Sequence, residues 1–524
     1  MSPLNPRKGA EGLLNYNNMN KHLNLNPNTI VRYLEKMPEE FTREDIIKFI
    51  SENDVQMINF MYPGEDGRLK TLNFVINNYE YLETILTEGE RVDGSSLYPS
   101  FVEAGNSDLY VIPRYRTAFM DPFAELPTLC MLCSFYTKDG EPFEGAPYET
   151  LTRAAKAFRE KTGMEFEAMG ELEYYVIDDE EDLFPATDQR GYHESAPFAK
   201  LGDFRQKCMA YVAQAGGQIK YGHSEVGNFT REGRVYEQNE IEFLPCPVYT
   251  AADQLLVAKW VIRNLAYEYG LDVTFAPKII VGEAGSGLHI HMRMTKDGKN
   301  MMLDADRKLS EVARRSIAGM MLLAPAITAF GNKNPTSYFR LVPHQEAPTN
   351  VCWGDSNRSA LVRVPLGWTS GKDMSAIVNP LEERHDNAPH TLEKQTFEMR
   401  SPDCSADIYQ LMAGLCVAAR VGLEMPAEEA LRITAEKYVD VNIHAAENAD
   451  RLAQLDTLPT CCAESADRLE QMRSYFEAEG VFTKRIIDGI ISSLRSFDDR
   501  DLHARAEADP ALMQQLVEEY FYCG

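Results

Sequence analysis

The sequence predicts a protein of mixed helices and strands that folds into more than one lobe. Its 524 residues have ordinary globular composition, with 44% hydrophobic and 25% charged residues, and suffice for a large core. After Pro147 the pattern changes from short strand-like segments to strands that alternate with amphipathic helices, and from Tyr409 onward it is helical. These observations exclude collagenous, disordered and disulfide-scaffold proteins.

A leader is expected in front of the first lobe. Residues 29–36 predict one short helix, and Thr42-Arg-Glu-Asp begins a second helix that continues to Ile50. The polar, Asn-rich start lacks the apolar core of a signal peptide, and no apolar run is long enough to span a membrane. We therefore expect a soluble cytoplasmic protein with three parts: a leader with a short helix at 1–40, a small domain at 41–140, and a large domain with a helical C-terminal region at 141–524.

The small domain is expected to be rich in β-strands. Residues 55–62 and 69–75 predict a hairpin, because the turn sequence Pro-Gly-Glu-Asp-Gly separates two apolar segments. Residues 109–113 and 128–136 predict two further strands. The large domain is expected to contain long helices at 148–162, 251–269 and 310–330.

Charge and cysteine content narrow the classes of partner. The net charge of −27 arises from 53 basic and 80 acidic residues and disfavours binding to nucleic acids and to anionic membranes. The ten cysteines lie mostly in apolar segments, so buried thiols are expected. Cys130-Met-Leu-Cys133 has the spacing of a redox or zinc motif, but no second pair lies nearby in the sequence, which favours a structural role.

Carboxylates and imidazoles recur at strand spacing in the large domain. In Glu171-Leu-Glu173 the two carboxylates point to the same face of an extended segment with apolar flanks. Like charges near a core are costly without cations, so a Mg²⁺ or Mn²⁺ site is favoured over a solvated strand face. His289-Ile-His291 repeats this spacing after the glycine-rich run 282–287, whose backbone can approach a ligand closely. Further acidic segments lie at 223–227, 238–241 and 397–400.

Several arginines accompany these segments. Arg340, Arg358 and Arg363 lie in half-apolar surroundings, and guanidinium groups bind carboxylates and phosphates through paired hydrogen bonds. A surface ion pair is the simpler explanation for any single arginine. Together with a carboxylate cluster, however, the arginines indicate phosphoryl transfer to an anionic acceptor. The sequence has no Walker lysine motif and no kinase-type glycine loop with a downstream His-Arg-Asp, which disfavours the familiar nucleotide-binding folds.

In these segments the chain resembles the glutamine synthetase superfamily, in its bacterial type I form. The resemblance runs in order from about Thr42 to about Gly422, and the motifs at 92–97, 275–278 and 398–403 also carry it. It implies an α+β fold, with an N-terminal β-grasp lobe and a C-terminal catalytic α/β lobe whose curved antiparallel sheet forms the site. It also implies a homo-oligomer of stacked rings, expected to be a dodecamer, with active sites between neighbouring subunits.

The activity implied by the resemblance is the ATP-dependent ligation of ammonia to the γ-carboxylate of L-glutamate. The reaction passes through γ-glutamyl phosphate and yields glutamine, ADP and phosphate. Two or more Mg²⁺ or Mn²⁺ ions per subunit are the implied cofactors. Carried over position by position, the ligands are Glu173, Glu225 and Glu240 for one ion, and Glu171, His289 and Glu398 for the other.

The resemblance also implies substrate-binding and catalytic residues. Asp93 is expected to take a proton from ammonium, which has no lone pair until it is deprotonated. Glu346 is expected to close the site against water, and Arg358 to act beside the transferred phosphate. The implied binding residues are Gly285, Arg340, Glu346, Arg358 and Arg400 for glutamate, His291, Arg358 and Arg363 for ATP, and Asp93, Ser96, Tyr192 and Glu225 for ammonium.

Ala284 departs from the family pattern, and two other functions stay open. The glycine loop of the family usually has Asn at this position, so an amide that orients the amino acid is missing here. A γ-glutamyl-amine ligase that uses a polyamine or an alkylamine would have an opened ammonium pocket, yet Asp93, Tyr192 and Glu225 are retained. A non-catalytic structural or regulatory relative would have lost metal ligands, and all six positions carry the expected residue types.

Overall fold

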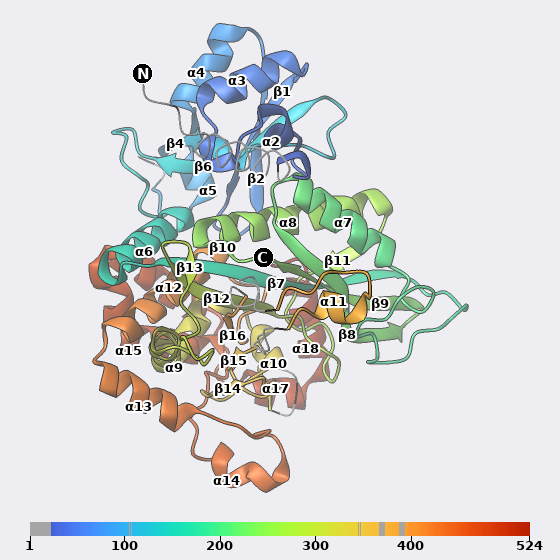
Figure 1. Ribbon diagram of the computed structural model, residues 1–524, viewed down its shortest axis with the longest axis vertical. Helices are drawn as coiled ribbons and strands as arrows, with labels where there is room; N and C mark the ends of the chain where they lie inside the picture. Colours follow the sequence, from blue (N-terminus) through green and yellow to red (C-terminus); the bar gives the residue numbers. More distant parts are fainter. Residues whose placement is uncertain are drawn as a thin grey trace. The chain divides into compact units, whose positions relative to one another are not determined.

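The computed structural model describes residues 23–103, 105, 107–343, 345, 347–365, 372–386 and 394–524 (Figure 1). The chain divides into two compact units. The first comprises Met1–Ala146, Gln206–Ile219 and Leu256–Tyr269, and the second comprises Pro147–Arg205, Lys220–Leu255 and Gly270–Gly524. Two helices, α7 (Gly202–Gln214) and α8 (Val248–Tyr269), are thereby shared between the units.

The first unit contains a six-stranded sheet with the strand order β2-β1-β6-β4-β3, in which β5 also pairs with β6. The predicted hairpin is confirmed, because β1 and β2 pair antiparallel from Met57 opposite Val75 to Pro63 opposite Leu69. β6 runs parallel to β1. The strands are β1 (Met57–Pro63), β2 (Leu69–Val75), β3 (Glu90–Asp93), β4 (Asp108–Pro113), β5 (Phe119–Met120) and β6 (Thr128–Tyr136).

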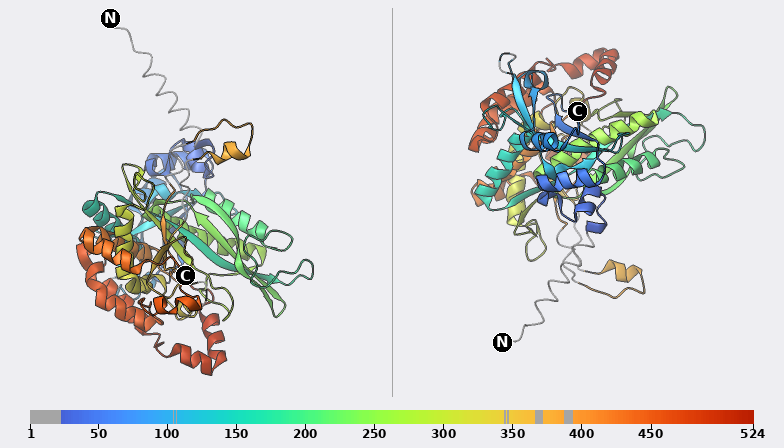
Figure 2. Two further views of the ribbon diagram at one scale, coloured as in Figure 1. Left: turned by 60° about the horizontal axis from the view of Figure 1, so that its bottom comes forward. Right: turned by 90° about the horizontal axis from the view of Figure 1, so that it is seen from above.

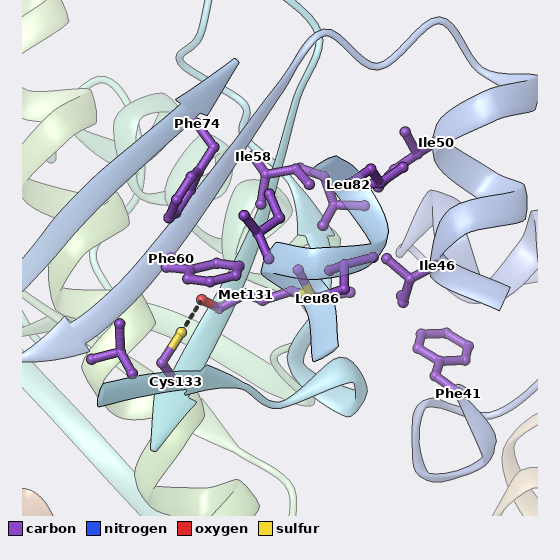
Figure 3. Close-up of a cluster of buried hydrophobic side chains, with 14 of the residues drawn as sticks. Phe41, Ile46, Ile50, Ile58, Phe60, Phe74, Leu82, Leu86, Met131 and Cys133 are labelled. Carbon is purple, nitrogen blue, oxygen red and sulfur yellow. Dashed lines mark hydrogen bonds between the residues drawn. The ribbon is translucent and has the colours of Figure 1, made fainter. Parts of the chain in front are cut away.

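Helices cover this sheet and close a hydrophobic core (Figure 3). Ile46 of α3 and Leu82 and Leu86 of α4 are buried in one cluster with Ile58 and Phe60 of β1. Burial of such side chains is the main stabilising contribution of the lobe. The helices are α2 (Thr29–Leu34), η1 (Pro38–Glu40), α3 (Arg43–Glu52), α4 (Tyr79–Glu88), α5 (Gly94–Leu97) and η3 (Tyr115–Thr117).

Cys130 and Cys133 are both buried on β6. The Cys133 thiol donates to the carbonyl oxygen of Met131 at 3.8 Å (Figure 3). Burial raises the pKa of both thiols, so neither is a ready nucleophile or metal ligand at neutral pH. The pair contributes to the core of this unit.

Thr42 caps α3, and its removal is expected to weaken the first unit. Its hydroxyl accepts from the Asp45 amide at 3.2 Å, and the Asp45 carboxylate accepts from the Thr42 amide at 2.9 Å. Thr42→Ala should lower the unfolding free energy of this unit by about 1 kcal/mol, because amides at the helix start lose their partner. Thr42→Ser retains the hydroxyl and should melt close to the parent. Thermal unfolding followed by circular dichroism measures the difference, and equal midpoints for Ala and Ser would contradict the capping role.

The second unit is built on a ten-stranded sheet with the order β14-β15-β16-β12-β7-β9-β8, extended by β10 and β11 on β7 and by β13 on β12. The pairings are mainly antiparallel, but β14 and β15 are parallel. Its strands are β7 (Glu165–Asp179), β8 (Ile219–Arg231), β9 (Arg234–Phe243), β10 (Cys246–Pro247), β11 (Asp272–Thr274), β12 (Leu288–Lys296), β13 (Lys299–Asn300), β14 (Trp353–Asp355), β15 (Val362–Val364) and β16 (Phe397–Met399).

Long helices gather beside this sheet (Figures 1 and 2). α9 and α12 approach closely through glycines: a Cβ on Gly319 would lie 1.9 Å from the Ala418 oxygen, and one on Gly422 would lie 2.0 Å from the Arg315 oxygen. The remaining helices of this unit are α6 (Pro147–Thr162), α9 (Glu311–Gly331), α10 (Ser337–Arg340), α11 (Met374–Val378), α12 (Ile408–Glu424), α13 (Ala427–Lys437), η5 (Ala446–Asn448), α14 (Ala449–Leu452), α15 (Cys462–Glu477), η6 (Ala478–Gly480), α16 (Lys484–Arg495), α17 (Leu502–Ala508) and α18 (Pro510–Tyr520).

The predicted long helices of the large domain are confirmed within a few residues by α6, α8 and α9. Within the described ranges, no single helix is long and apolar enough to cross a membrane. Together, α12 and α13 reach that length and apolar composition, but the two helices are bent by 118° relative to each other.

Candidate functional site

A cavity of about 870 Å³ lies in the second unit. Side chains of four neighbouring strands, β7, β8, β9 and β12, line it together with the glycine-rich loop before β12 and the segment around Arg358. The strand register determines which charged groups meet there. On one side of β7 the register pairs acidic with basic side chains: Glu171 lies opposite His289, while Glu398 lies opposite both His291 and Arg363. On the other side it pairs carboxylates, with Glu171 opposite Glu242 and Glu173 opposite Glu240.

His291 lies between two buried carboxylates. Its Nε2 is 2.7 Å from an oxygen of Glu171 and 2.6 Å from an oxygen of Glu398, and its Nδ1 is 2.9 Å from the Thr396 hydroxyl. Burial disfavours the imidazolium, but the charges of Glu171 and Glu398 outweigh burial and raise the pKa of His291 to about 10. His289 Nδ1 contacts the other oxygen of Glu171 at 2.9 Å.

Glu398 is fully buried and surrounded by cations. Arg363 donates to it at 2.8 Å, and Arg400 Nε lies 3.2 Å from the same oxygen. Burial alone would raise the pKa of this carboxyl, but the charges of His291 and Arg363 lower it to about 2. The buried Glu398 carboxylate is therefore ionised and matched by nearby positive charge.

The carboxylates on β9, directly beside Glu171 and Glu173 in the sheet, have too little positive charge around them. Glu240 Oε1 is 3.1 Å from His223 Nε2, and Glu242 accepts from Lys220 at 2.5 Å and from the Tyr221 hydroxyl. Burial, followed by the charges of Glu171 and three other carboxylates, raises the pKa of Glu240 well above its usual range. A divalent cation would offset this repulsion, and carboxylate oxygens with imidazole nitrogens are suitable ligands for Mg²⁺ or Mn²⁺.

All six predicted metal ligands lie in the second unit. Five of them line the cavity, whereas Glu398 is fully buried and contacts His291 and Arg363, which do line it. Two sets of potential ligand atoms lie within 4.8 Å of one another among the described residues: Glu171, His291 and Glu398, and His223, Glu240 and Glu242. His291, predicted to contact ATP, thus lies among the carboxylates. The division of the six ligands between two ions stays a prediction.

Sequence reasoning missed His223 and Glu242. Glu242 lies two residues after Glu240, with the same spacing as Glu171 and Glu173, so both side chains point to one face of the strand. Glu242 lies opposite Glu171 in the sheet, and both residues line the cavity. Applying that rule to β9 would have found it. His223 carried no signal beyond its place two residues before Glu225.

Side chains hold the glycine-rich loop by its backbone. The Tyr175 hydroxyl donates to the carbonyl of Ala284 at 2.8 Å, and Gln238 donates to that of Gly285 at 2.9 Å. The amide of Gly287 donates to Glu173 at 2.6 Å. A Cβ at Gly285 would lie 2.7 Å from the Pro277 oxygen, so only glycine permits this approach.

The predicted substrate arginines converge on the cavity. Arg340 is buried, donates to the Ser401 carbonyl at 2.8 Å and to the Arg400 carbonyl at 3.2 Å, and approaches His289 Nε2 at 3.4 Å. The Arg400 guanidinium donates to the carbonyl of Arg358. The guanidinium of Arg358 lies over the ring of Tyr192, 5.9 Å from its centroid.

The predicted ammonium residues Asp93 and Ser96 belong to the first unit. Asp93 accepts from the Ser95 hydroxyl at 2.6 Å and from the Ser96 hydroxyl at 2.7 Å, and these hydrogen bonds lower its pKa to about 2. Asp93 is therefore a carboxylate at neutral pH, as a proton acceptor must be. Glu346, the predicted lid residue, lies outside the described residues.

Two family models match this chain. Residues 54–138 match the family model "Glutamine synthetase, beta-Grasp domain", and residues 144–507 match "Glutamine synthetase, catalytic domain". Glutamine synthetase of Clostridium saccharobutylicum is 32% identical over 445 residues, covering 82% of this chain and 90% of the relative. That of Mycolicibacterium smegmatis is 29% identical over 496 residues, covering 87% and 95%.

Among solved structures, the cryo-EM structure of Plasmodium falciparum glutamine synthetase superposes with a TM-score of 0.70 at 19% identity and covers 88% of this chain and 98% of that one. At this identity the likeness concerns the fold. It confirms the expected α+β architecture with a β-grasp domain.

Proposed function

Since the chain belongs to the glutamine synthetase family, we propose that it ligates ammonia to the γ-carboxylate of L-glutamate, with ATP converted to ADP and phosphate. One observation carries the proposal. A continuous ion-pair network crosses four strands at the cavity and consists of Glu171, His291, Glu398 and Arg363. Next to it lie Glu240 and Glu242, which have little positive charge around them. Such a site can hold divalent cations on carboxylates and a phosphate on arginines in one place.

Six residues would hold the metal ions: Glu171, Glu173, Glu225, Glu240, His289 and Glu398. When bound, the ions supply positive charge to the phosphate that moves from ATP to glutamate. Arg358 and Arg363 add guanidinium groups, which stabilise charge on that phosphate. Arg363 is well placed for this, because Glu398 holds its Nη1 at 2.8 Å. The activated γ-carboxyl of glutamate then reacts with ammonia.

We propose that ammonium binds between Tyr192, Glu225 and the pair Asp93 and Ser96 of a neighbouring subunit in a homo-oligomer of stacked rings. The hydrogen bonds that lower the pKa of Asp93 to about 2 keep it anionic, which supports binding of the ammonium cation; transfer of a proton to Asp93 requires that these hydrogen bonds rearrange, because they make the carboxylate a weaker base. Glu346 is predicted to close the site against water, which would protect the acyl phosphate from hydrolysis.

An assay of phosphate release with ATP, L-glutamate and Mg²⁺ or Mn²⁺ tests the proposal. Release should require glutamate and ammonium, stop on chelation of the metal, and return when the metal is restored. Methylamine, ethylamine and putrescine serve as competing acceptors. Turnover with only a bulky amine would contradict the ammonia reaction and support a γ-glutamyl-amine ligase, and no turnover with any acceptor would support a non-catalytic relative.

A further inference from the structure

The loop between β7 and α7 is fastened to strand β8 so that Gln189 reaches the cavity. The amides of Gln189, Gly191 and His193 donate to the carbonyls of alternate β8 residues, at 2.8, 3.2 and 2.9 Å. A Cβ on Gly191 would lie 2.4 Å from the Glu225 oxygen, so glycine is required for this approach. The loop therefore follows the strand that carries Glu225, and Gln189 lines the cavity.

The backbone of Gln189 is held in an uncommon conformation. Its φ of 52° lies in the left-handed region, which is unfavourable for a residue with a side chain. Such conformations persist where surrounding structure imposes them, and they occur often at binding sites. The position of the Gln189 side chain is thus determined by the fold.

The orientation of the Gln189 amide follows from its partner. Its Oε1 lies 3.0 Å from the backbone nitrogen of Ala284, which can only donate. The donor Nε2 must then point the other way. This Nε2 is buried and finds no hydrogen-bond partner anywhere in the described ranges, an arrangement that is unfavourable unless a water or a ligand supplies an acceptor.

Other polar groups around the loop already have partners. The carbonyls of Ala284 and Gly285 accept from Tyr175 and Gln238, and Ala284 itself has no polar side chain. Arg340 donates from both terminal nitrogens to backbone carbonyls. Gln189 Nε2 is therefore a donor beside this loop that remains available to a bound molecule.

We propose that Gln189 Nε2 donates a hydrogen bond to the α-carboxylate of L-glutamate, and so supplies the amide that position 284 lacks. The inference rests on the proposed function. The γ-carboxylate must meet the phosphate at the carboxylate and imidazole clusters, whereas Gln189 is bonded to the glycine-rich loop. The donor on the loop thus serves the carboxylate that does not react.

Kinetics of two variants of the full chain test the inference. Gln189→Ala should raise the KM for glutamate about 10-fold, as expected for one lost hydrogen bond to a charged group. Gln189→Glu keeps an oxygen for the Ala284 amide but places a negative charge against the carboxylate, so its KM should rise about 100-fold. Both kcat and the KM for ATP should change little, because the lost contact is present in ground and transition states alike.

Arg190→Ala serves as the matched control, since Arg190 is the exposed neighbour on the same loop and should leave all constants unchanged. A Gln189→Glu variant with the glutamate KM of the parent would overturn the inference and leave a purely structural hydrogen bond to Ala284. Calorimetric titration with L-glutamate separates this result from failure of the proposed function: a parent chain that neither binds nor turns over glutamate contradicts the function, and with it the ligand assigned to Gln189.

Discussion

Glu398→Gln is expected to abolish turnover while the chain still folds. Glu398 is fully buried and forms ion pairs with Arg363, Arg400 and His291. The neutral amide of glutamine would leave these three cations without their anion. The pKa of His291, raised to about 10 in part by this carboxylate, should fall. We expect a loss of at least about 10³-fold in kcat, since both a metal ligand and the support of Arg363 disappear.

Two measurements separate chemistry from folding in this variant. Titration with Mn²⁺ should show one site fewer per chain, and circular dichroism should show retained secondary structure. The unfolding free energy should drop by about 3 kcal/mol, because buried cations lose their partner. Glu507→Gln, an exposed carboxylate on α17, is the control and should behave as the parent. Full activity of Glu398→Gln would refute the assignment of this residue to the metal site.

Gly227→Ala is expected to disturb the two side chains that hold the glycine-rich loop. A Cβ at this position would lie 1.9 Å from the Tyr175 hydroxyl and 2.7 Å from Gln238 Oε1. Tyr175 is buried against Phe229, with ring centroids 5.7 Å apart, and cannot move aside freely. Overpacking should cost about 1–3 kcal/mol of unfolding free energy. Because Tyr175 and Gln238 hold the glycine-rich loop, kcat/KM for glutamate should fall about 100-fold.

Gly202→Ala provides the same chemical change without the clash, because the nearest atom to its Cβ would be Arg205 Nη2 at 3.8 Å. Its melting temperature and kinetics should match those of the parent. If Gly227→Ala also matched the parent in both measurements, Tyr175 and Gln238 would not be needed to position the loop.

Local features of the chain were predictable because they depend on near neighbours. Thr42 and Asp45 form the expected start of α3, and the turn at 63–67 joins the expected hairpin. The alternation of Glu171 and Glu173 on β7 correctly indicated one face of a strand, and both side chains line the cavity. Short strands such as β14, β15 and β16 were not predicted, because three residues carry no periodic signal.

The pairing of distant segments could not be derived from patterns. His291 and Glu398 lie opposite each other only because β12 and β16 are neighbours in the sheet, and β6 runs parallel to β1 although the chain between them is long. Family resemblance predicted Glu398 as a metal ligand, but its full burial among cations is a property of the fold. Gln189 carried no sequence signal, since its importance comes from a backbone conformation and a bond to Ala284.

The sequence by itself determined the residue types needed for the chemistry and the family to which the chain belongs. It also determined which side chains share a strand face, since a strand alternates with a period of two. Only the tertiary structure decided which charges balance, and it left Glu240 short of positive charge while surrounding Glu398 with cations. The physical reason is that burial and ion pairing depend on register between strands far apart in the chain, and these contacts determine both the pKa values and the donors left free for a substrate.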